Sequence, residues 1–76
     1  MEYDDDLDAC GLLCPLPVLK AAKRMRSMDT GRVLRLQADD PAAVVDVPHY
    51  CAESGNVYLG LEEVEGAQHH FLQKSK

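Results

Sequence analysis

One cysteine of this 76-residue chain stands directly before two prolines that flank a single residue, in the run Cys14-Pro15-Leu16-Pro17. Proline is accepted in the first turn of an α-helix, where backbone N–H groups have no partner within the helix, and is disfavoured deeper inside. The spacing therefore predicts a helix with Cys14 as N-cap, Pro15 at the first position and Pro17 at the third. A helix N-terminus carries roughly half a positive charge, so we expect the pKa of a thiol there to fall below about 8.5. The run predicts a nucleophilic sulfur held at a rigid corner.

Basic residues follow this cysteine directly, and they argue against interpreting it as a buried core residue. A free cysteine is most often a small buried hydrophobic residue. Four of the eight basic residues, however, fall within seven positions of the predicted helix: Lys20, Lys23, Arg24 and Arg26. Lys20, Lys23 and Arg24 are either a docking surface for an acidic partner or a solvated helix face.

Three blocks of the sequence resemble segments of the TusA/SirA-type sulfur-carrier family, in the same order and at similar spacing. The first is the CPxP run at residues 14–17. The others are Ala38-Asp39-Asp40-Pro41-Ala42, similar to the acidic entry to the family's second helix, and Asp46-Val47-Pro48-His49-Tyr50-Cys51, similar to a segment inside that helix. The resemblance spans about residues 6–74. One departure is Leu13, which stands where the family often has a basic residue, so the pKa of the thiol or the choice of partner can differ.

The resemblance implies a sulfurtransferase that accepts sulfane sulfur as a persulfide on Cys14 and relays it to another protein. The implied donor is a cysteine desulfurase or another persulfidated protein, and a downstream acceptor protein takes the sulfur. Such exchange needs an exposed thiol and no deep pocket, because both partners bring their own catalytic groups. The acceptor can serve tRNA thiolation, molybdenum-cofactor synthesis or sulfur oxidation, and the sequence does not choose among them.

Two other classes of function remain open. A thiol–disulfide redox module would use Cys10 together with Cys14, in which case Cys10 is a second functional thiol rather than a small strand residue. A non-catalytic regulatory interaction domain would act through the basic helix alone. Cys51, which lies away from the CPxP run, is expected to be a core thiol.

Composition sets further limits. The length allows one domain, residues 1–76, in which we expect the acidic residues 1–5 to be disordered. No apolar run is long enough for a membrane span, and the N-terminus lacks the pattern of a signal peptide. Three cysteines, an odd number, favour a reducing compartment, and the net charge of −5 argues against nucleic-acid binding. We therefore expect a cytoplasmic monomer that contacts proteins, with no cofactor, nucleic acid or membrane.

The histidines and cysteines invite a metal hypothesis that their spacing does not support. Cys10 and Cys14 have three residues between them, and no second pair follows at a zinc-like distance. His69 and His70 are adjacent in a predicted strand and should point to opposite faces. No metal site is predicted, and the acidic pair at residues 39–40 is interpreted as a helix cap and turn.

Apolar spacing predicts two helices. The first covers residues 15–28 with an apolar stripe that includes Val18, Ala22 and Met25, widened by Leu19 and Met28, and ends in a polar turn. The second begins at residues 40–41, where an N-cap aspartate precedes a proline, and ends at residues 55–56. Pro48 either kinks this helix or divides it into two pieces.

Alternation of apolar and polar residues predicts four strands. A short edge strand covers residues 6–10, and residues 32–38 place Leu34, Leu36 and Ala38 on one face. Residues 57–65 and 69–74 form a hairpin, whose first strand is predicted to place Val57, Leu59 and Leu61 on one face. The predicted order is β-α-β-α-β-β, an α+β two-layer sandwich with two helices on one face of a four-stranded mixed sheet.

Overall fold

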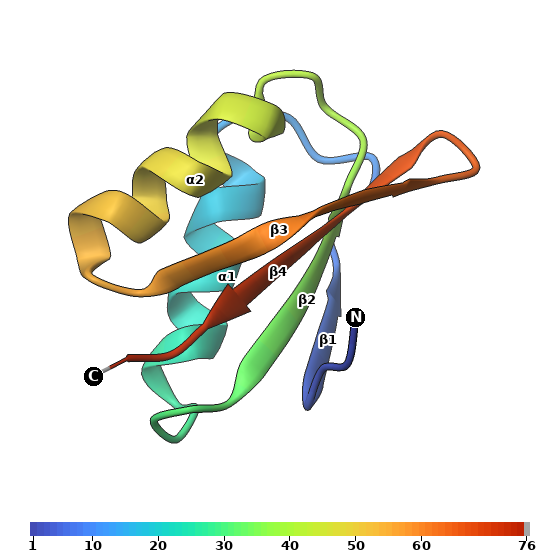
Figure 1. The fold of residues 1–76 in the computed structure, drawn as a ribbon. Coiled ribbons are helices and arrows are strands. Elements are labelled where there is room, and N and C mark those ends of the chain that lie inside the picture. The colour runs from blue at the N-terminus through green and yellow to red at the C-terminus, as the bar shows by residue number, and fades with distance from the viewer. Residues whose placement is uncertain (76) are drawn as a thin grey trace.

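Two helices cover one face of a four-stranded sheet in the computed structural model, which describes residues 1–75 (Figure 1). The order of elements is the predicted one: β1 (Asp5–Asp8), α1 (Leu16–Arg26), β2 (Val33–Ala38), α2 (Ala43–Ser54), β3 (Val57–Val64) and β4 (Ala67–Gln73). The α+β two-layer architecture predicted from the sequence is confirmed. Within residues 1–75, neither helix has the length and apolar character needed to cross a bilayer.

The sheet runs in the order β1-β2-β4-β3, with β1 and β2 parallel and the other pairs antiparallel. The edge position predicted for the first strand is confirmed. Because the carboxyl ends of parallel neighbours meet at the same edge of a sheet, the loops after β1 and β2 begin side by side. This one pairing brings residues 9–15 next to residues 39–42.

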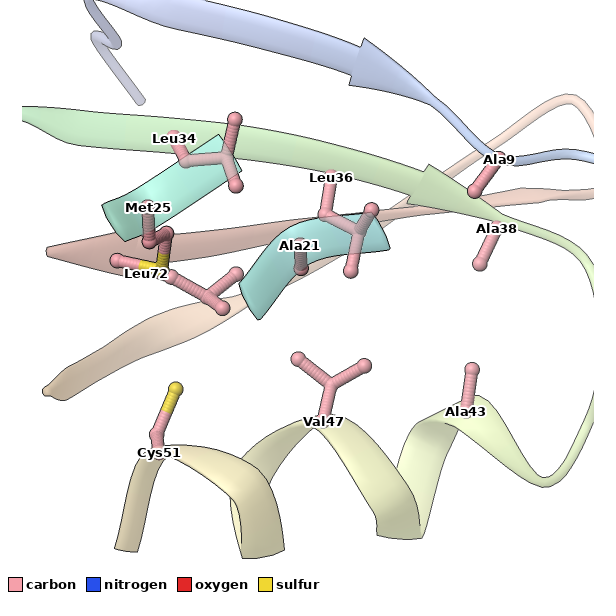
Figure 2. Packing of buried hydrophobic residues seen from close by; sticks show 10 residues of the cluster. All are labelled: Ala9, Ala21, Met25, Leu34, Leu36, Ala38, Ala43, Val47, Cys51 and Leu72. Carbon is pink, nitrogen blue, oxygen red and sulfur yellow. The ribbon is translucent and has the colours of Figure 1, made fainter. Parts of the chain in front are cut away.

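The core lies between the sheet and the helices (Figure 2). Leu34, Leu36 and Ala38 of β2 are buried on one face, as the alternation predicted. Figure 2 shows Ala43, Val47 and Cys51 on one side of α2, directed toward α1 and the sheet; their spacing of four residues is the period of a buried helix stripe.

The buried stripe of α1 differs from the predicted one. It consists of Pro17, Ala21 and Met25, whereas Val18 is only half-buried and Leu19 is exposed. Only Met25 of the predicted core stripe is therefore fully buried. The small side chain of Ala21 lets α1 approach the sheet closely, and the larger side chains of the predicted stripe lie at the margin of this contact or outside it.

The second helix begins two residues later than predicted. Pro41 and Ala42 form a turn in which the Ala43 N–H donates to the Asp40 carbonyl at 2.9 Å, and α2 starts at Ala43. Pro48 lies inside one continuous helix rather than between two pieces. Gly55, with φ 84°, ends the helix in the left-handed conformation, as predicted.

The apolar face predicted for β3 is wrong. Tyr58 pairs with the core residue Leu72, and the register is irregular between Tyr58 and Gly60, so Val57 and Leu59 are exposed. The physical reason is polar: the Tyr58 hydroxyl lies 2.8 Å from Nδ1 of His70, which is fully buried in β4. The tyrosine thus satisfies a buried histidine that a valine or leucine would leave without a partner.

Residues before β1 lie against the sheet face opposite the helices. The Tyr3 ring is 6.4 Å from that of Phe71, the Arg35 guanidinium lies 4.3 Å from the Tyr3 ring centroid, and the Asp4 N–H donates to the Val33 carbonyl. The expectation that residues 1–5 are disordered is therefore corrected at Asp4 and Asp5, because Asp4 is hydrogen-bonded to β2 and Asp5 lies within β1. Tyr3 packs on Phe71, and the Met1 amino group lies 3.4 Å from the Glu62 carboxylate, so residues before Asp4 are placed against the sheet as well.

A chain of polar groups runs through the helix-facing side of the sheet. Gln68 donates its amide N–H to the Asp40 carbonyl at 2.9 Å, so its Oε1 accepts the Nε2–H of His70 at 2.7 Å. Nδ1 of His70 then accepts the Tyr58 hydroxyl proton. The neutral ring satisfies this chain, and burial lowers the pKa of His70 from 6.5 to about 4.

We predict that His70 makes the fold sensitive to mild acid. Because the folded pKa lies below the unfolded value, the unfolded chain binds the extra proton first, and stability falls as the pH drops from about 6.5 toward 4. The loss between pH 7 and pH 5 should be about 2 kcal/mol in urea unfolding. His70→Gln should lack this loss and His69→Gln should keep it. An equal loss in both variants would contradict the assignment.

Candidate functional site

Cys14 lies in the loop after β1, and two aspartates of the loop after β2 hold that loop. The Asp39 carboxylate accepts the Gly11 N–H at 2.9 Å, and the Asp40 carboxylate accepts the Cys14 N–H at 2.7 Å. Gly11 has φ 86°, a left-handed conformation that glycine adopts without strain. The parallel pairing of β1 and β2 makes these contacts possible across 26 to 28 residues of sequence.

The acidic pair thus does more than the predicted cap and turn. The turn is present, since Asp40 Oδ1 accepts the Ala42 N–H at 3.1 Å. The other oxygen of the same carboxylate holds the backbone of Cys14. No local pattern reports this second role, because the partners come from separate segments of the chain.

Cys14 is not the N-cap of α1, and this corrects the predicted register. The N-cap is Pro15 and the helix begins at Leu16, so Pro17 occupies the second helical position. The Cys14–Pro15 peptide bond is cis. The first N–H of the helix, that of Leu16, donates to the Leu13 carbonyl at 2.9 Å, and no side chain caps this end. The thiol therefore stands one residue outside the position where the helix dipole would act on it most strongly.

The charges around the Cys14 thiol are negative. Asp46, in the first turn of α2, lines the same hollow as Cys14, and its carboxylate is the largest cause of a raised pKa for the Cys14 thiol. Some desolvation and the charge of Asp40 act in the same direction. The predicted lowering of the pKa is therefore wrong, because the negative charges of Asp46 and Asp40 disfavour the thiolate. A narrow hollow joins these groups, lined by Cys14, Pro15, Pro17, Val18, Asp40, Ala43 and Asp46.

Exposed apolar side chains lie on the loop and the two helices that form this corner. Leu13 is 70% exposed and Leu16 and Leu19 follow it on the outside of α1, while Val45, 71% exposed, lies in the first turn of α2 beside Val44. We call these five residues the apolar collar: Leu13, Leu16, Leu19, Val44 and Val45. Sequence alone does not reveal this surface, because Leu19 fits the predicted apolar stripe of the helix and the other four residues come from separate segments that show no common pattern.

The predicted basic surface is divided in two by the structure. Arg24 donates through Nη1 to the Asp5 carboxylate at 3.3 Å and to the Asp6 carbonyl at 3.1 Å, so it ties α1 to β1. Lys20 and Lys23 are exposed on the same helix. A docking role for Lys20 and Lys23 stays a prediction, and Arg24 has a structural role that a partner would have to displace.

The other two cysteines differ in their surroundings. Cys51 is buried in the core, where desolvation raises its pKa to about 11, so the predicted core thiol is confirmed. Cys10 is exposed, its N–H donates to the Asp8 carboxylate at 2.9 Å, and burial together with Asp8 and Asp39 raises the pKa of its thiol. Cys10 and Cys14 are both free thiols here.

The histidines lie apart, as their sequence positions suggested. His70 faces the core and is fully buried, whereas His69 lies on the other face of β4 and is half-buried. Among residues 1–75, no three His, Cys, Asp or Glu side chains are arranged to hold a metal ion.

We predict that Asp40 fixes the backbone of the Cys14 corner. Asp40→Ala removes the acceptor of the Cys14 and Ala42 N–H groups, and each lost charge-assisted hydrogen bond should cost about 1–2 kcal/mol. The amide of Cys14 should then exchange with deuterium faster, measured by mass spectrometry or NMR. The amide of Gly11, held by Asp39, is the internal control and should change less. Unchanged protection at Cys14 would show that the corner holds without Asp40.

Comparison with known proteins places this geometry in a family. The family described as Sulfurtransferase TusA matches residues 5–74. The sulfur carrier protein TusA of Allochromatium vinosum is 42% identical over 73 residues, covering 96% of this chain and 95% of that protein. A putative sulfur carrier protein of Aquifex aeolicus is 36% identical over 75 residues. The match covers 99% of this chain and 38% of the length of the Aquifex protein.

Solved structures show the same fold. The crystal structure of a SirA-like protein from Desulfitobacterium hafniense superposes with a TM-score of 0.82, covering 96% of this chain and all of that one at 22% identity. At that identity the likeness speaks for the architecture alone. The family match over nearly the whole chain, together with the full-length relative, carries the assignment: the chain belongs to the TusA family of sulfurtransferases.

Proposed function

We propose that this chain, as a TusA-family sulfur carrier, holds sulfane sulfur as a persulfide on Cys14. The observation that carries the proposal is the presentation of this thiol: it is exposed, at a corner whose backbone is fixed by Asp39 and Asp40. The hollow beside it is too narrow to enclose a substrate. A thiol offered in this way suits exchange with another protein that covers the corner on docking.

The chemistry is two thiol–persulfide exchanges. The Cys14 thiolate attacks the terminal sulfur of a donor persulfide, R–S–SH; a bond forms between Cys14 Sγ and that sulfur, and the donor's S–S bond breaks. The donor leaves as a thiolate and takes up the proton that Cys14 lost, so the products are R–SH and Cys14–S–SH. An acceptor thiolate then attacks the outer sulfur and restores Cys14. The chain supplies the nucleophile, and the enzymatic character of the reaction is shared with its partners.

The surface near the thiol suits the docking of both a donor protein and an acceptor protein. The apolar collar offers contact area on the loop that carries the thiol and on the two helices beside it, and Lys20 and Lys23 offer positive charge to an acidic surface. We propose a cysteine desulfurase or another persulfidated protein as donor, and a downstream protein as acceptor. The net charge of −5 supports protein contacts rather than direct contact with nucleic acid. The proposed setting is the cytoplasm, with the chain acting as a monomer.

The test is intact-mass spectrometry after incubation with a cysteine desulfurase, its cofactor and cysteine. Wild type should gain the mass of about one sulfur atom, removable by reductant, and Cys14→Ser should gain none. Cys10→Ser is the matched control, because it removes the other exposed thiol and should still be loaded. An adduct that survives Cys14→Ser, or no adduct on wild type with several donors, would overturn the proposal. Loss of activity in Cys10→Ser would favour the redox module instead.

A further inference from the structure

Two carboxylates converge on Cys14 from the second helix region, and they do different things. Asp40 holds the Cys14 backbone through the N–H, at 2.7 Å. Asp46 lines the same narrow hollow as Cys14, and its carboxylate acts on the thiol through its negative charge. Among the hydrogen bonds of residues 1–75, none joins the Asp46 side chain to the backbone of this corner. The side chain lies at the hollow beside Cys14, where its charge acts on the thiol.

The effect of this arrangement is to disfavour the thiolate. A negative charge beside the sulfur stabilises the protonated form, and both carboxylates raise the pKa of Cys14. The thiol is a far poorer nucleophile than the thiolate, so the resting corner reacts slowly. Small anionic sulfur compounds and thiolates are also repelled by the same charges. An exposed thiol of a sulfur carrier is thereby protected from unproductive exchange.

Asp46 also borders a second surface, from which a cation of another protein could reach its carboxylate and neutralise the charge. A shallow groove beside the hollow is lined by Pro15, Val18, Asp46, His49, Tyr50 and Glu53. The surface of this groove is largely apolar, and its lining includes the carboxylates of Asp46 and Glu53, the latter 3.2 Å from His49. Such a groove fits a lysine or arginine side chain, whose aliphatic stem packs on the apolar lining while its charge pairs with a carboxylate.

We propose that Asp46 is a specificity-determining residue, which holds Cys14 as a thiol toward free small molecules and yields when a protein donor places a cation in this groove. This inference rests on the proposed persulfide function of Cys14. When the cation pairs with Asp46, the thiol releases its proton to water, and the thiolate attacks the terminal sulfur of the donor persulfide. The departing donor thiolate then takes up a proton, so the exchange balances without an added oxidant or reductant.

The first test is the pH dependence of alkylation by iodoacetamide, a neutral reagent, in a Cys10→Ser background so that Cys14 is the exposed thiol. Asp46→Asn should lower the apparent pKa of Cys14, and the rate at pH 7 should rise about tenfold for each unit of the shift. Asp46→Glu, which restores the charge, should stay close to wild type. Asp29→Asn is the matched control: it removes the same charge beyond the far end of α1 and should leave the rate unchanged. An unchanged profile in Asp46→Asn would overturn the inference.

The second test compares donors by intact mass. Loading of Asp46→Asn from hydropolysulfide should be several-fold faster than that of wild type, whereas loading from the cysteine desulfurase should not be faster. Equal acceleration with both donors would overturn the role of a partner's cation. If wild type takes no sulfur from any donor, or if Cys14→Ser is loaded as well, the proposed function fails, and the alkylation profile still reports separately whether Asp46 controls the thiol.

Discussion

The hydrogen bond from the Cys14 N–H to the Asp40 carboxylate joins two loops that are distant in sequence, and the functional corner depends on it. The bond is possible because β1 and β2 are parallel neighbours, so their carboxyl ends meet at one edge of the sheet. On its other side, the Asp40 carbonyl accepts the Gln68 amide, which continues to His70 and Tyr58 in the interior. The corner that presents the thiol is therefore anchored in the core of the sheet, through one residue that belongs to neither helix nor strand.

Two opposite charges act on this thiol: the partial positive charge of the helix that follows it directly, and the negative charge of carboxylates far away in the sequence. The carboxylates have the larger effect. A helix N-terminus favours a thiolate over about one turn, and the effect is greatest at the capping position. Here Pro15 takes that position, which moves the sulfur outward, and the second helix brings Asp46 against it. A full negative charge near the thiol outweighs the partial positive charge of a helix end that the thiol only adjoins. Resemblance identifies the cysteine but not this reversal, because the reversal depends on contacts between α1 and α2.

The fold followed from the sequence wherever the pattern was local. The alternation of Leu34, Leu36 and Ala38 identified the buried face of β2, and the glycine at position 55 identified the end of α2. The apolar periodicity gave wrong predictions where a buried polar side chain, or the contact between a helix and the sheet, determined the packing. Tyr58 faces inward because His70 needs a partner, and Ala21 rather than Ala22 meets the sheet. At the site, sequence located Cys14 and the acidic pair, but the acceptors of the loop's N–H groups come from 26 and 28 residues away.

The packing of Tyr3 on Phe71 places the N-terminal residues on the sheet face opposite the helices. The helices, with the Cys14 corner at the start of α1, occupy one face, and the chain before β1 lies along the other (Figure 1). The amino group of Met1 reaches as far as Glu62 of β3, at 3.4 Å. Polypeptide joined ahead of Met1 would thus emerge behind the sheet, away from any protein docked on the thiol. Labels, surface tethers or further domains attached there would leave the corner open to its partners.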